Sequence, residues 1–177
     1  TLTSSTTDAQ GRVSGTWRLG TAAGAQQAQV SAALPNGNAW VTLNATAAAG
    51  PADAMVTLGG DAQQGDVSRP LPQPLVVRVS DAYGNPAANV DVAFAVTQGG
   101  GTLSAATART GANGNAQVTW TLGATAGQQR ATATLARAAG PVVRQFTATA
   151  LAASPATLFT LAHRVLDAEF SASANRI

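Results

Sequence analysis

The chain has 177 residues, enough for one ordinary domain and part of a second, and its formal net charge is +2. All ten basic residues are arginines, scattered singly, which argues against nucleic-acid binding because that function needs clustered positive charge. The absence of cysteine excludes a disulfide framework and a thiolate metal site, and no apolar run approaches the roughly 20 residues of a membrane helix.

The first 50 residues predict three short strands. Apolar residues alternate over 13–19, 28–32 and 41–45, and Pro35-Asn-Gly-Asn38 supplies a turn before the third strand. So few strands leave an apolar face and an unpaired edge exposed. We therefore expect residues 1–50 to dock on a neighbour, to oligomerise through this edge, or to be poorly ordered alone.

A boundary follows at the short linker Ala49-Gly-Pro51. Ala54, Val56 and Leu58 then alternate at the start of a strand, which later glycines break into a ragged edge. Three prolines within residues 69–74 remove ladder donors, so this stretch is predicted to be an extended approach and not a central strand.

Residues 75–98 carry the clearest pattern in the chain. Two runs, 75–80 and 90–96, alternate strictly between apolar and other residues, which indicates half-buried strands. Between them lies Asp81-Ala-Tyr-Gly-Asn-Pro86, a turn in which Gly84 tolerates a positive φ. The predicted inward residues are Leu75, Val77, Val79, Val90, Val92, Phe94 and Val96.

The next 50 residues continue the same style. Short strands are predicted at 102–104, 116–122 and 131–135, with a polar stretch at 105–110 and a last strand after Pro141. Seven or eight short strands, glycine- and proline-containing turns and no predicted helix favour an all-β antiparallel sandwich. Trp120 and Phe146 are predicted to lie in its core.

An internal repeat links the two parts of the chain. Between residues 7–28 and 110–131, at a constant offset of 103, 11 of 22 positions are identical. This period is too long for a solenoid and is typical of tandem whole domains. Residues 1–50 are thus interpreted as the C-terminal half of one domain and 51–156 as a complete domain. Trp17 is the counterpart of Trp120, which favours a core role for both.

Residues 157–177 depart from the repeat, and we interpret them as a tail or as the start of another domain. The ending DAEFSASANRI faintly resembles the first strand of a bacterial β-propeller blade; a linker strand is the alternative. His163 in this segment is the single histidine. One histidine without cysteine gives little support to a metal site or a Ser-His-Asp triad.

The run LPQPLVVRVSDAYGNPAANVDVAF, followed by GGGTLS and VTWTLG, resembles the bacterial immunoglobulin-like group 1 (Big-1) domain of invasin- and intimin-type adhesins. The resemblance covers about 55–152 as a complete copy and 1–50 as a C-terminal half. It implies an Ig-like sandwich stacked in rods on the bacterial surface, which hold a terminal binding domain away from the membrane. It supplies no catalytic residues, and the lectin-like binding domain of such adhesins, with its cysteine pair, has no match here.

Few residues are candidates for binding. Asp61 and Asp66 are weak candidates for Ca²⁺, because carboxylates at domain junctions bind this ion, but no Asp-x-Asp spacing supports them and turn hydrogen bonds are the alternative. Trp40 is a candidate surface contact, because its counterpart in the repeat is Val143 and it is therefore not demanded by the core.

The sequence therefore predicts a non-catalytic spacer repeat of an exported bacterial surface protein of the adhesin type. Its expected partners are neighbouring repeats of the same chain, with any host or cell-surface ligand bound through other domains. Two alternatives are an accessory module of a secreted enzyme or propeller protein, and direct glycan binding on an exposed face.

Overall fold

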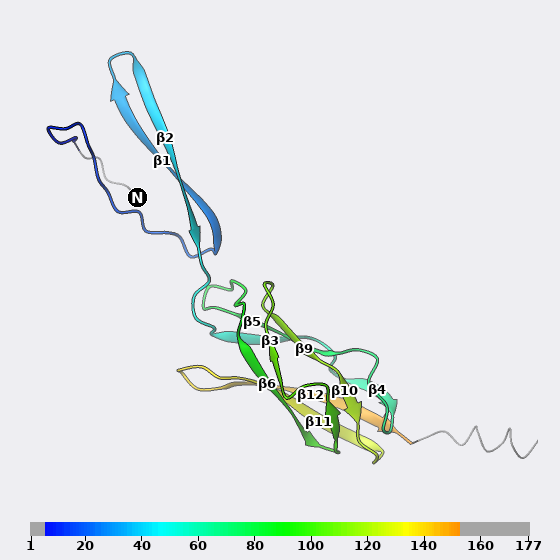
Figure 1. Ribbon diagram of the computed structural model, residues 1–177. Helices are drawn as coiled ribbons and strands as arrows, with labels where there is room; N and C mark the ends of the chain where they lie inside the picture. Colours follow the sequence, from blue (N-terminus) through cyan, green and yellow to red (C-terminus); the bar gives the residue numbers. More distant parts are fainter. Residues whose placement is uncertain (1–5, 153–177) are drawn as a thin grey trace, which may run out of the picture.

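The structure, a computed structural model, describes residues 6–152, which form a β-hairpin and a β-sandwich (Figure 1). The hairpin consists of β1 (Gly24–Leu34) and β2 (Gly37–Ala47) and projects away from the sandwich. The sandwich begins with β3 (Ala54–Gly59) and ends with β12 (Val142–Leu151). Every regular element in this part of the chain is a strand, as the alternating sequence pattern predicts.

The sandwich contains ten strands. Between the first and the last lie β4 (Gln63–Asp66), β5 (Leu75–Ser80), β6 (Asp91–Gln98), β7 (Gly101–Leu103), β8 (Thr107–Arg109), β9 (Asn115–Val118), β10 (Trp120–Leu122) and β11 (Gly127–Leu135). One sheet has the strand order β3-β5-β9 and the other β4-β12-β11-β6-β8, with the pair β10-β7 completing the enclosure. The β4-β12 pair is parallel and all the others are antiparallel, so the sandwich is not antiparallel throughout.

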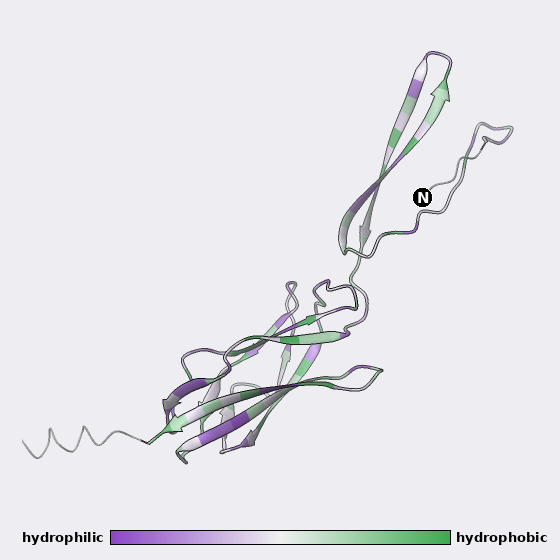
Figure 2. Ribbon diagram, turned by 180° about the vertical axis from the view of Figure 1, so that it is seen from behind, coloured by the Kyte–Doolittle hydropathy of each residue, from purple (hydrophilic) through white to green (hydrophobic). Residues whose placement is uncertain are grey.

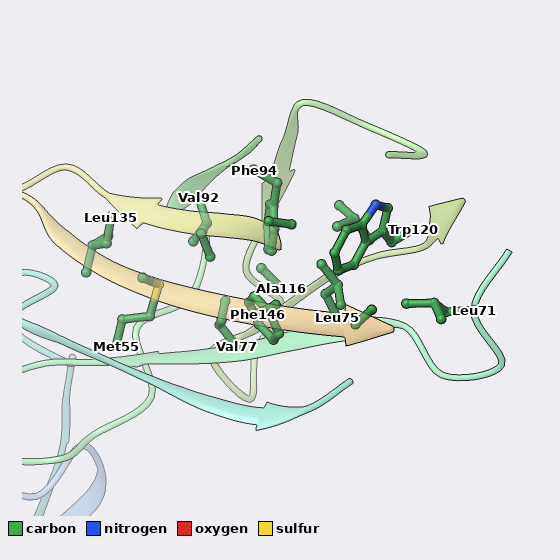
Figure 3. Close-up of a cluster of buried hydrophobic side chains, with 14 of the residues drawn as sticks. Met55, Leu71, Leu75, Val77, Val92, Phe94, Ala116, Trp120, Leu135 and Phe146 are labelled. Carbon is green, nitrogen blue, oxygen red and sulfur yellow. The ribbon is translucent and has the colours of Figure 1, made fainter. Parts of the chain in front are cut away.

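The core lies between the two sheets. Successive residues of a strand point to opposite faces, so β5 buries every second side chain while those between are half-buried. Trp120 and Phe146 are the largest fully buried side chains, and Figure 3 shows Trp120 beside Leu75 in the shared interior. Burying one such side chain contributes roughly 1.5–3 kcal/mol. These contacts between distant segments hold the two sheets together.

The first edge strand differs from the expected alternation. Met55 is fully buried, whereas Val56 and Leu58 are about half exposed, so the predicted inward face was wrong by one residue. After β3 pairs with β5, Gly60 adopts φ +85° and the chain crosses to the other sheet, where β4 pairs with β12. A left-handed backbone at a glycine permits this change of sheet, which periodicity alone does not reveal.

Two other predicted stretches also differ. Residues 116–122 are not one strand: the chain divides at Thr119, where β9 leaves its partner β5 and β10 joins β7. The polar stretch 105–110 contains the short strand β8, which pairs with β6. Both are edge features whose hydrogen bonds depend on distant partners, so local alternation does not identify them.

The segment before β1 is where the prediction fails most. Residues 13–19 form no strand, and Trp17 is only half-buried, although its counterpart Trp120 is fully buried in β10. In the sandwich β10 pairs with β7, and no strand equivalent to β7 is present among the described residues before β1. The hairpin likewise keeps apolar side chains in solvent, including Trp40 and Val41, and Figure 2 shows apolar stretches on its strands.

Candidate functional site: the junction between the hairpin and the sandwich

The junction is built on the turn between β5 and β6, which starts at Asp81. The Asp81 carboxylate is buried, and its Oδ1 accepts hydrogen bonds from the backbone N–H groups of Tyr83 and Asn85, both at 2.9 Å. Gly84 has φ +85° and its N–H donates to the Asp81 carbonyl at 3.1 Å. An aspartate that binds its own turn in this way fixes the loop before any partner arrives.

The second carboxylate oxygen of Asp81 reaches the linker. Oδ2 accepts hydrogen bonds from the Gly50 N–H at 2.8 Å and from the Asn85 side-chain Nδ2 at 2.8 Å. The Asn85 side chain, together with the N–H groups of Gly50, Asn85 and Tyr83, lowers the pKa of Asp81 to about 2, against the opposing effect of burial. The anion is therefore the form that holds the linker.

Asn85 binds the other side of the junction. Its Oδ1 accepts a hydrogen bond from the Ala23 N–H at 2.9 Å, and its Nδ2 donates to the Thr21 carbonyl at 2.8 Å. One amide side chain thus satisfies a backbone donor and a backbone acceptor two residues apart. Together with Asp81 it forms the junction cluster, defined here as these two side chains and the backbone of Thr21, Ala23 and Gly50.

The loop that Asn85 binds is shaped by a glutamine. Gln26 Oε1 accepts from the Gly20 N–H at 2.8 Å, and Gln26 Nε2 donates to the carbonyls of Gly20 at 3.3 Å and Ala22 at 2.7 Å. Residues 20–26 are called the Gln26 loop below. Because the glutamine occupies the inward backbone groups, the groups of Thr21 and Ala23 are left to face the junction.

The sandwich contains a loop of the same construction, residues 123–129, called the Gln129 loop below. Gln129 Oε1 accepts from the Gly123 N–H at 2.8 Å, and Gln129 Nε2 donates to the carbonyls of Gly123 at 3.4 Å and Thr125 at 3.0 Å. Gly127 has φ +118° and its counterpart Gly24 has φ +116°. The two loops therefore share their sequence offset, their hydrogen bonds and their backbone turn.

Comparison with known proteins places the junction turn inside a family domain. Residues 73–150 match the family model of the bacterial Ig-like domain (group 1). The matched part of the sandwich is called the Big-1 domain from here on. The match includes Asp81 and Asn85 but neither the Gln26 loop nor the linker, so it covers the sandwich side of the junction only.

Several solved structures resemble the chain. The D00-D0 domain of intimin is 21% identical, with a TM-score of 0.43, and the alignment covers 72% of this chain and 66% of that one. The D0-D1 domain of intimin is also 21% identical, with a TM-score of 0.42, covering 70% and 62%. Domains 1–6 of the surface layer protein SbsC are 13% identical, with a TM-score of 0.45, covering 74% and 20%. The chain thus spans less than two thirds of the length of each of these structures. No curated protein matches the sequence.

The candidate metal ligands do not come together. Asp61 Oδ1 accepts hydrogen bonds from the N–H of Ala62 and from the N–H and hydroxyl of Thr147. Burial opposes the charged form, but these hydrogen bonds outweigh it and lower the pKa of Asp61. Asp66 lies exposed at the end of β4, and residues 6–152 contain no group of three metal-ligating side chains. Asp61 thus ties β12 to the loop after β3, which is the turn-bonding alternative. His163 lies outside the described residues.

The structure separates the predicted core residues from the predicted contact residue. Trp40 is 61% exposed on β2, and its counterpart Val143 is 50% exposed, so this position faces solvent in both parts of the chain. Trp17, predicted to be a core residue, is not one. The predicted residues that lie in the core of the Big-1 domain are Trp120, Phe94, Phe146, Val77 and Val92.

The junction cluster was missed at the level of sequence. Asp81 and Asn85 were interpreted as turn residues, and their turn role is what the spacing of an aspartate, a glycine and an asparagine indicates. Nothing in that pattern shows that the same side chains also bind Gly50 and the Gln26 loop. A signal was available in the repeat itself, because Gln26 and Gln129 are identical and predict one loop used twice. Within residues 6–152 no helix is long and apolar enough to cross a membrane.

Proposed function

We propose that this chain is a spacer segment of an exported bacterial surface protein of the adhesin type, and that its role is to hold successive Ig-like domains at a defined junction. Residues 1–50 serve as the second half of one repeat and the Big-1 domain as the core of the next. The family match and the internal repeat support this role. Host or cell-surface ligands are assigned to other parts of such a protein.

The observation that carries the proposal is the junction cluster. A flexible linker would leave the backbone groups of residues 20–50 to water, whereas here Asp81 and Asn85 bind three of them at 2.8–2.9 Å. Each such bond contributes about 0.5–1.5 kcal/mol net, more where a carboxylate is the acceptor. Three bonds spread over both sides of the linker restrain its direction as well as its length.

The orientation of the hairpin relative to the Big-1 domain tests the proposal. Residual dipolar couplings of the full chain should report one dominant orientation, and Asn85→Ala should broaden it by removing two of the three bonds to the hairpin side. Asn38→Ala, at the tip of the hairpin, is the matched control and should change nothing. Independent reorientation of the two parts in the unsubstituted chain would contradict the spacer role.

A second candidate function is contact with a glycan through Trp40. Its indole lies on the outer face of β2, 61% exposed, and exposed aromatic side chains stack well on apolar faces of sugar rings. We expect Trp40→Val, which installs the residue of the counterpart position, to abolish retention on a polysaccharide array while leaving the melting temperature within about 1 °C, because exposed substitutions cost within about 0.5 kcal/mol. No retention of the unsubstituted chain would rule this function out.

A further inference from the structure

We propose that the Gln129 loop is a docking site for a second copy of the Big-1 domain, which binds it through the side chain of its own Asn85. The inference rests on the proposed spacer function and names the partner surface that the function requires. It is drawn from the two loops described above, one of which already holds an asparagine in this structure.

The occupied loop defines what the docking site offers. Asn85 reads the carbonyl of Thr21 and the N–H of Ala23, and at the repeat offset these positions are Ala124 and Ala126. Both groups belong to the backbone, so the change of side chain from threonine to alanine leaves the recognition unaltered. The second position is alanine in both loops.

The Gln129 loop holds these groups ready. Gln129 is buried, and its three hydrogen bonds reproduce those of Gln26, which fixes the inward backbone groups of the loop. Ala124 and Ala126 are exposed, and within the described part of the chain no hydrogen bond involves the Ala124 carbonyl or the Ala126 N–H. A donor and an acceptor are thus presented to solvent in the arrangement that Asn85 binds elsewhere.

The close packing behind the loop makes it more rigid than its counterpart. A Cβ at Gly123 would lie 2.0 Å from the Gly99 carbonyl oxygen, so only glycine permits this approach of the two turns. The Gly123 carbonyl also accepts a hydrogen bond from the Ser68 N–H at 3.2 Å. The docking groups therefore lie on a loop supported from two sides, and binding orders little that is not already fixed.

The occupant is a following repeat and not an unrelated protein. The linker side of the cluster needs a backbone N–H at position 50, and a Cβ there would lie 3.5 Å from Asp81 Oδ2, an ordinary contact. The repeat counterpart of Gly50 is Ala153, which fits that space by composition. At the same offset Leu158, Thr160 and Leu161 fall on Met55, Thr57 and Leu58, so the start of the β3 pattern recurs in the sequence.

The test inserts a second copy of residues 50–152 after Ala152 in the full chain, and measures amide hydrogen exchange by NMR. We expect exchange of the Ala126 amide in the first copy to slow by about fivefold, the change that one net hydrogen bond produces. Asn85→Ala in the inserted copy should restore fast exchange at Ala126 and leave Ala23 unchanged. Asn85→Ala in the first copy should do the reverse.

The outcomes separate the two proposals. Equal exchange at Ala126 with and without the inserted copy, or slow exchange that survives Asn85→Ala in that copy, would overturn the docking site. An inserted copy that does not fold in this position would also overturn it, because the loop is required to accept a folded neighbour. If Ala23 itself ignores Asn85→Ala in the first copy, the junction cluster fails, and the spacer function fails with it.

Discussion

Residues 7–50 and residues 110–152 carry related sequences, yet one forms an open hairpin with a coil before it and the other completes a sandwich. The features that are the same in both are local. Gly11 and Gly114 have φ of +74° and +76°, and the two glutamine loops match bond for bond. Turns and loops whose hydrogen bonds close within six residues form in either context.

The features that differ need distant partners. Trp120 is fully buried because β7 and β5 cover it, whereas Trp17 has the same neighbours in sequence and remains half-buried. Ala131 and Ala133 of β11 are buried against β6, but their counterparts Ala28 and Val30 of β1 are only half-buried. The comparison separates structure that a segment specifies alone from structure that the whole sandwich supplies.

The largest expected effect sharpens this contrast at the two tryptophans. Trp120→Ala should lower the free energy of unfolding of the sandwich by about 3–5 kcal/mol, as for other large-to-small core changes. Trp17→Ala should lower it by less than about 1 kcal/mol, because its side chain is not enclosed. Calorimetry of both variants checks this, with Trp120→Phe as the milder control. Equal losses for the two alanine variants would contradict the difference in burial.

A smaller effect is expected at the two glutamines. Gln129→Ala leaves the buried Gly123 N–H without its partner and should cost about 1–3 kcal/mol. Gln26→Ala should cost less, because water reaches the exposed groups of its loop. Denaturant titration measures both, and Gln128→Ala, an exposed neighbour, should stay within about 0.5 kcal/mol. A costless Gln129→Ala would mean that the loop keeps its shape without the glutamine.

The smallest expected effect is a change with pH at the junction. The pKa of Asp81 is lowered to about 2, so the bond to Gly50 is fully present above the ordinary aspartate pKa near 4 and is lost as the pH falls toward 2. The Gly50 amide shift, followed by NMR, should titrate with a midpoint near pH 2. Asp81→Asn should remove that titration. A midpoint near 4 would show that the carboxylate does not bind these amides.

The sequence predicted the part of the fold that periodicity controls. The strict alternation around Val77 and Val92, and the turn at Asp81, were read correctly because each depends on residues a few positions away. The resemblance to the group 1 Ig-like domain, carried by the same stretch, agrees with the family match over residues 73–150.

What the sequence did not predict depends on contacts between segments far apart in the chain. The inward residue of β3 is Met55, because the register of that edge is set by pairing with β5 and not by local alternation. The role of Asn85 at the junction depends on residues 62 and 64 positions away. A turn motif identifies the bonds that it makes with itself and is silent about those that it makes with a neighbour.

The parallel pairing of β4 with β12 has a mechanical consequence. The first segment of its sheet and the last run in the same direction, so tension applied along the chain slides one past the other. Four register pairs, from Ala148 with Gln63 to Leu151 with Asp66, then carry the load together, whereas a hairpin pulled at its open end separates one pair at a time. The sandwich therefore resists stretching by shear, and the hairpin opens first.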